Sequence, residues 1–206
     1  MASVVAIYNM ALGHLGTRAT VAATDESSVE ARECTRHYAT VRDELLRGFD
    51  WTFARRTELL TRRSETPPDG WTYIYAMPNL CARFHGIWTG PRPTGKPVSF
   101  EIANVADASG GADALGILSN QSPAWGRYTR VVENSELFGS GFTTALSWRL
   151  AEAVALSITN SASTFERVIR TAQIRTLEAK AADANEGITE TDQPVPDWLA
   201  ARGFTD

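Results

Sequence analysis

The chain has 206 residues, of which 43% are hydrophobic and 21% are charged, a balance typical of a globular protein with a sizeable core. Its formal net charge of −4 at pH 7 argues against a protein that holds nucleic acid tightly by neutralising phosphates. No apolar run is long enough to cross a bilayer, and the first residues, MASVVAIYNMALGHLG, lack the pattern of a signal peptide. We therefore expect a soluble protein, made in a cytoplasm, with no membrane partner.

The first predicted elements, within residues 1–54, are helices of a bundle. Ser3 can cap a first helix and Gly16 can end it. Ser27 and Glu30 have the spacing of a capping box at the start of a second helix. This second helix carries an apolar stripe at steps of three and four residues, which consists of Ala31, Cys34, Tyr38, Val41 and Leu45.

Residues 55–134 differ from the preceding residues in their sequence pattern and predict an inserted β lobe. Short runs of β-branched and aromatic residues alternate with Pro and Gly, which is typical of strands and turns. Because no helix is predicted between these runs, we expect an antiparallel sheet or small barrel. The predicted strands are Arg56–Thr61, Trp71–Ala76, Arg83–Trp88, Val98–Ile102, Ala114–Ser119 and Tyr128–Val132.

Helices return in residues 135–187, which complete the predicted bundle. One apolar stripe begins at Phe142 and ends near Asn160, and Ser163 with Glu166 has the spacing of a second capping box. The long charged helix that follows contains a late apolar series and meets Gly187 as its stop; this series is Ile174, Leu177, Ala181 and Ala184. The predicted fold class is therefore α+β, a helical bundle built from the N- and C-terminal helices with an inserted small antiparallel β lobe.

Residues 188–206 predict an extended tail that docks on a partner. The tail contains two prolines and a late apolar cluster, and large apolar side chains on such an arm often mark a contact. The candidate docking residues are Trp198, Leu199 and Phe204. The alternative, that the tail folds back on the chain's own helices, stays open at this point. Two further tryptophans, Trp51 and Trp148, lie in helical patterns and are expected in the core.

The stretch GPRPTGKP at residues 90–97 resembles a phosphate-binding loop, because Gly90, Gly95 and Lys96 have nearly the required spacing. The residues around them do not fit. Pro97 stands where Ser or Thr would hold magnesium, other prolines remove N–H donors, and a strand rather than a helix follows. We therefore predict no nucleotide site and a stiff loop between two strands.

No motif predicts catalysis, a metal site or a cofactor. The histidines, His14, His37 and His85, have no carboxylate or cysteine at ligand spacing, and no nucleophile motif is present. Cys34 and Cys81 lack a CxxC partner, so we favour two small buried thiols in a reducing compartment over a disulfide. We expect a protein that is not an enzyme. A small hydrolase whose site forms from distant segments stays open as an alternative.

Three blocks of the sequence, in their order and spacing, resemble the head–tail adaptor proteins of tailed phages, also called the tail tubular protein A family. The first is IYNMALGHLG with SVEARECTRHYATVRDELLRGFDWTFARRTELL, and the second is GWTYIYAMPNLCARF. The third combines TALSWRLAEAVALSIT, a helix ending EAKAADANEG, and a tail with DWLAARG. The resemblance covers roughly the first ninety and the last seventy residues, whereas the stretch at about 90–130 is not diagnostic.

This resemblance implies a structural virion protein of the phage neck, assembled in the cytoplasm of a bacterial host. Copies would form a closed ring of about twelve subunits, which joins the portal protein to the tail tube or nozzle. DNA would pass through the lumen at ejection without specific binding, and the mild acidity of the chain is consistent with this. Another head- or tail-completion protein is the nearest alternative.

Overall fold

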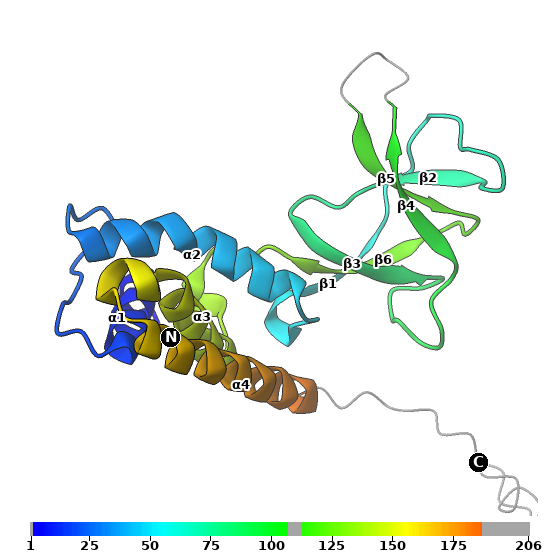
Figure 1. Cartoon of the computed structure of the whole chain (residues 1–206). Coiled ribbons are helices and arrows are strands. Elements are labelled where there is room, and N and C mark those ends of the chain that lie inside the picture. The colour runs from blue at the N-terminus through cyan, green and yellow to red at the C-terminus, as the bar shows by residue number, and fades with distance from the viewer. Residues whose placement is uncertain (1, 107–112, 187–206) are drawn as a thin grey trace, which may run out of the picture.

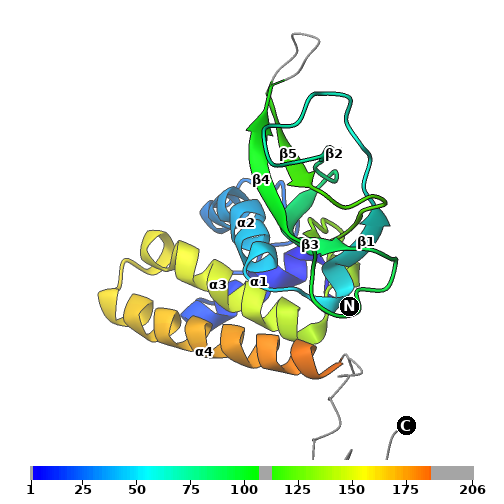
Figure 2. The same cartoon turned by 90° about the vertical axis from the view of Figure 1, so that its right-hand side faces the viewer.

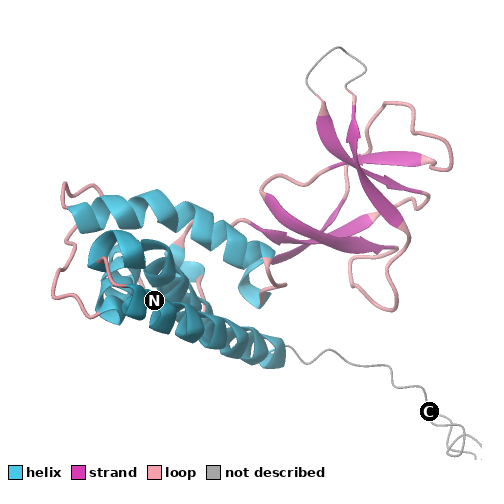
Figure 3. Ribbon diagram, viewed as in Figure 1, coloured by secondary structure: helices cyan, strands magenta, loops and turns pink. Residues whose placement is uncertain are grey.

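In the computed structural model, residues 2–106 and 113–186 are described. Within these ranges the chain forms four α-helices, six β-strands and two short 3-10 helices. The helices gather on one side of the molecule and the strands on the other (Figures 1 and 3). The helices are α1 (Val4–Leu15), α2 (Val29–Arg47), α3 (Ser140–Thr159) and α4 (Ala162–Glu186).

The helical side is organised around α3, which packs against α1, α2 and α4. Figure 2 shows α3 and α4 side by side, joined through the left-handed turn at Asn160 (φ 47°). By contrast, α1 and α4 meet only marginally. Three helices therefore surround the central helix α3. The predicted helical bundle is present only in this form, because the outer helices contact one another little. Fully buried side chains of α3 fill its middle; they include Leu146, Leu150, Ala151 and Val154.

The helix starts correct two sequence predictions. Ser3 accepts a hydrogen bond from the Ala6 amide at 3.2 Å, as predicted. The cap of α2, however, is Ser28, whose Oγ accepts from the Ala31 amide at 3.3 Å, so the predicted Ser27–Glu30 box is wrong. The Ser163–Glu166 box is also wrong, because α4 begins at Ala162 and Ser161 supplies the capping oxygen. At both helix starts two serines lie close together in the sequence, and the side chain of either can cap a helix.

The strands form two three-stranded antiparallel sheets within the described ranges, in the orders β1-β6-β3 and β2-β5-β4. Aromatic and aliphatic side chains from both sheets make a second core, with Tyr75, Phe84, Ile117 and Tyr128 among its members. The strands are β1 (Arg55–Leu59), β2 (Tyr73–Ala76), β3 (Cys81–Trp88), β4 (Phe100–Val105), β5 (Ala114–Ser119) and β6 (Trp125–Arg130).

The predicted α+β class is confirmed, and each predicted strand has a counterpart in the structure. The bounds of β5 agree with the prediction, whereas β6 begins and ends earlier. Trp51 is fully buried as expected, but Trp148 is only half-buried. Both cysteines are free. None of the helices in the described part of the chain is long and apolar enough to cross a membrane.

Candidate functional site

The loop at residues 90–97 lies between two strands, as the sequence predicts. It connects β3 to β4, and the Val98 amide donates to the Ile87 carbonyl at 2.8 Å to close its base. Gly95 adopts a left-handed conformation (φ 69°). Because β4 and not a helix follows, no helix N-terminus is available here to face a phosphate group.

The three histidines are distributed over different elements. His14 on α1 stacks on Trp148 of α3, with ring centroids 3.8 Å apart and planes 8° from parallel. Its Nε2 lies 3.0 Å from Ser147 Oγ. Burial, followed by the charges of Arg175 and Arg167, lowers the pKa of His14. Within residues 2–106 and 113–186, no group of three or more His, Cys, Asp or Glu side chains is placed to hold a metal ion.

A polar cluster around Asp50 joins the helices to the β lobe. The Asp50 carboxylate accepts hydrogen bonds from Arg55 Nε at 3.1 Å and from Arg127 Nη2. His85 Nε2 lies 3.5 Å from the same carboxylate and 2.8 Å from Thr129 Oγ1. Asp50 follows α2, while its partners lie on β1, β3 and β6. The cluster therefore fixes the lobe against the end of α2.

Electrostatics in this cluster favour the charged carboxylate. Burial by itself would raise the pKa of Asp50, but hydrogen bonds and positive charge from Arg55 and Arg127 outweigh it and lower the pKa. His85 responds differently. Burial lowers the pKa of its imidazole, and the nearby arginines add to this, although the Asp50 carboxylate opposes it. The Asp50 carboxylate is therefore held in its charged form between the guanidinium groups of Arg55 and Arg127.

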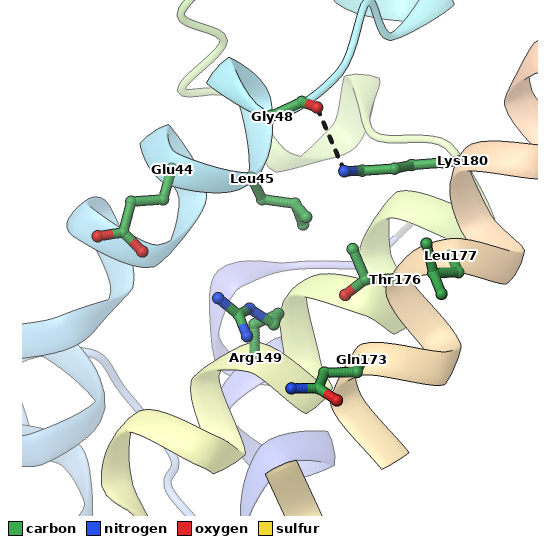
Figure 4. A pocket seen from close by; sticks show the side chains of 8 residues that line it. All are labelled: Glu44, Leu45, Gly48, Arg149, Gln173, Thr176, Leu177 and Lys180. Atoms are coloured by element: carbon green, nitrogen blue, oxygen red, sulfur yellow. Dashed lines mark hydrogen bonds between the residues drawn. The ribbon is translucent and has the colours of Figure 1, made fainter. Parts of the chain in front are cut away.

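A groove on the helical side, here called the outer groove, lies between α2 and α4 with α3 as its base (Figure 4). Its volume is about 450 Å³. Leu45 is almost buried, whereas Leu177 is 67% exposed. Lys180 Nζ donates to the Gly48 carbonyl at 3.2 Å across one end (Figure 4). The lining residues are Glu44, Leu45, Gly48, Arg149, Gln173, Thr176, Leu177 and Lys180.

A second hollow, here called the lobe cleft, lies where β3, β4 and β5 approach the end of α2, and its volume is about 610 Å³. Ile102 (42% exposed) and Leu115 (55% exposed) line it. In the β4–β5 register, Ile102 faces Ile117 and Asn104 faces Leu115, so both exposed side chains belong to the core-facing side of their sheet. Arg47 and Arg83 also line this cleft.

The predicted docking residues Trp198, Leu199 and Phe204 lie outside the described residues. Sequence reasoning missed both hollows as surfaces. A partial signal for the outer groove was present, because Leu177 belongs to the late apolar series of α4 but is not among the buried residues of that helix, Val168, Ala172 and Ala179. Leu177 is 67% exposed and lines the groove. No sequence pattern indicated the lobe cleft. The alternation of side chains along a strand predicts which residues face the core, but not which of them stay uncovered.

A scan against protein-family models finds no family that matches this chain, and a search of curated proteins finds no match either.

Proposed function

We propose that this protein is a head–tail adaptor of a tailed phage, a non-catalytic subunit whose copies close into a ring between the portal protein and the tail tube or nozzle. The resemblance of the three sequence blocks suggests the class. The observation that carries the proposal is the lobe cleft, where aliphatic side chains of a core-facing strand surface lie open at the junction of lobe and helices.

Exposed apolar side chains grouped in a hollow are a frequent feature of protein contact sites. The lobe cleft and the outer groove lie on different parts of the molecule, with Ile102 and Leu115 in one and Leu177 in the other. In a ring, each subunit presents two different surfaces to its two neighbours, because a heterologous contact is not self-complementary. Two separate apolar surfaces on one subunit support this kind of contact.

The ring is tested by electron microscopy in negative stain, on the purified protein alone and mixed with the portal protein of the same virus. We expect closed rings of about twelve copies in at least the mixture. A variant with Ile102→Asp and Leu115→Asp places two charges in the lobe cleft, which a buried contact cannot solvate. We expect it to remain folded, since both positions are exposed, and to form no rings.

A matched control carries Val29→Asp and Leu156→Asp, at positions 54% and 50% exposed and outside both hollows. The control should assemble like the unmodified chain. A chain that stays monomeric with the portal protein present contradicts the adaptor proposal. Binding to the portal or tail without ring closure favours the head- or tail-completion alternative, and saturable turnover of a small substrate by the monomer favours the hydrolase.

A further inference from the structure

The outer groove combines apolar walls with cationic rims. Leu45 of α2 and Leu177 of α4 belong to its two walls, and the Thr176 side chain of α4 also contributes to the lining (Figure 4). The lining carries two cations, Lys180 and Arg149, and one carboxylate, Glu44, and Arg149 is also paired with Glu152 at 2.7 Å. Lys180 is therefore the cation of the groove that no carboxylate pairs within the described residues. Such a surface suits an aromatic side chain flanked by a carboxylate, because the ring covers the leucines and lies beside the cations.

The chain itself contains a segment with these properties. Residues 187–206 follow the last residue of α4 and carry four acidic side chains (Glu190, Asp192, Asp197 and Asp206) against one basic side chain, Arg202. Within the segment, Asp197 directly precedes Trp198 and Leu199. The segment therefore matches the groove in apolar content, and its Asp197 carboxylate is complementary to the ammonium group of Lys180.

The length of chain after α4 is sufficient for this contact. Groove residues on α4 run from Gln173 to Lys180, which places them roughly 9–20 Å back along the helix from Glu186 at the rise of an α-helix. Trp198 lies twelve residues beyond Glu186, a span that reaches up to about 40 Å when extended. The segment can thus reverse after Gly187 and return to the groove with chain to spare.

We propose that, in the unassembled subunit, the segment Pro194–Phe204 docks in the outer groove of its own chain, with Trp198 over Leu45 and Leu177. The Asp197 carboxylate then lies near Lys180 or Arg149. Docking within one chain is favoured over docking between chains, because a short connection gives an effective concentration in the millimolar range. The proposal is independent of the adaptor function, and its test requires no ring.

The test uses the full-length chain and a fluorescein-labelled peptide of residues 187–206, titrated by fluorescence anisotropy. In the Trp198→Ala variant the groove is uncovered, and we expect saturable binding of the peptide. In the unmodified chain its own segment competes, so we expect binding about 100-fold weaker, at the low end of the gain that linkage gives. Adding Leu177→Asp to Trp198→Ala should weaken binding at least about tenfold, because the charge would be buried under the indole.

Ile174→Asp, also added to Trp198→Ala, is the matched control. Ile174 lies on the same helix and is 52% exposed, but it does not line the groove, so peptide binding should equal that of Trp198→Ala alone. Three results would overturn the proposal: no binding to Trp198→Ala, equal binding to Trp198→Ala and the unmodified chain, or no effect of Leu177→Asp. Sedimentation provides a further check. A dimer of the unmodified chain that Trp198→Ala dissolves would place the segment in a second copy and refute docking within one chain.

Discussion

The carboxylate of Asp50 holds side chains from β1, β3 and β6 against the end of α2. It is only a quarter exposed, at 25% of its side-chain surface. Substitution by asparagine preserves its shape but leaves Arg55 and Arg127 without their anion. Removal of one partner from a largely buried charge pair is costly, because the remaining charge is left uncompensated.

We predict that Asp50→Asn lowers the free energy of unfolding by about 1–3 kcal/mol at pH 7. The pKa of Asp50 is lowered in the folded state, so its contribution is present above the unfolded pKa, near 4, and is lost as pH falls through the folded pKa. Urea unfolding measured from pH 7 to pH 3 should show the difference between the two proteins shrinking toward zero at the acid end of this range.

The control for this prediction is Glu178→Gln, which removes an exposed pair with Arg175 on α4 (side chains 49% and 56% exposed). This change should cost less than about 0.5 kcal/mol. A constant difference between Asp50→Asn and the unmodified protein at all pH values would contradict an electrostatic role. His85 adds a second titration, because the Asp50 carboxylate opposes the lowering of its pKa by burial. Without that carboxylate, protonation of His85 below about pH 6.5 destabilises the folded state more, so the difference between the two proteins widens near pH 6 and shrinks only where Asp50 itself is protonated.

Sequence reasoning did not find the Asp50 cluster. Asp50 and Arg127 are separated by 77 positions, and no periodicity links residues that distant. Arg42 was missed for a related reason. Arg42 is not part of the apolar stripe of α2, and helical periodicity favours solvent exposure at such a position. In the structure it is only 8% exposed and donates to Asp43 at 2.8 Å. The hydrocarbon part of a long charged side chain can pack on apolar surface, because only its head group is polar. A pattern that classes each residue as either apolar or polar does not predict such burial.

Among the elements, α3 has the central role because three other helices pack on it. Leu150 is fully buried in α3, whereas Leu156, six residues later on the same helix, is 50% exposed. We predict that Leu150→Ala lowers the free energy of unfolding by about 2–5 kcal/mol, through lost apolar burial and the cavity that remains. Leu156→Ala should cost less than about 1 kcal/mol.

Guanidinium unfolding followed by circular dichroism measures both variants, and the exposed leucine serves as the control because its helix propensity change is the same. Similar costs for the two substitutions would show that α3 is not the centre of the core. The helix itself was predictable, since its apolar stripe and the Asn160 stop are local features. The pairing of β1 with β6 was not, because it joins residues such as Arg55 and Thr129 across the whole lobe.

For the whole molecule, the β lobe is an insertion whose entry and exit lie next to each other. Arg55, the first residue of β1, pairs with Thr129 near the end of β6, so the chain leaves and returns across one strand pair. Near residue 55 the helical apolar stripes are followed by short runs of β-branched and aromatic residues, and this change made the α+β class predictable. The relative placement of lobe and helices was not, because it depends on contacts such as Arg47 Nε with the Ala82 carbonyl at 3.1 Å.

We predict that the helices fold without the lobe. Replacing residues 57–127 by a short Gly–Ser linker should leave a cooperatively unfolding protein with a helical far-ultraviolet circular dichroism spectrum, because the core around α3 is separate from the core of the lobe. Loss of His85 and Arg127 from the Asp50 cluster, in which Arg55 remains, should reduce the stability without abolishing the transition. A spectrum of an unfolded chain would mean that the lobe is needed for the helices to fold.

The state of the two thiols has a practical consequence. Burial raises the pKa of both Cys34 and Cys81 to about 11, so at pH 7 only about one in ten thousand of either is the reactive thiolate. A cysteine introduced at an exposed position such as Val29, which is 54% exposed, would therefore react with a maleimide far faster than the native pair. Spin labels or fluorophores can then be attached to a chosen face of the protein with its natural cysteines left in place.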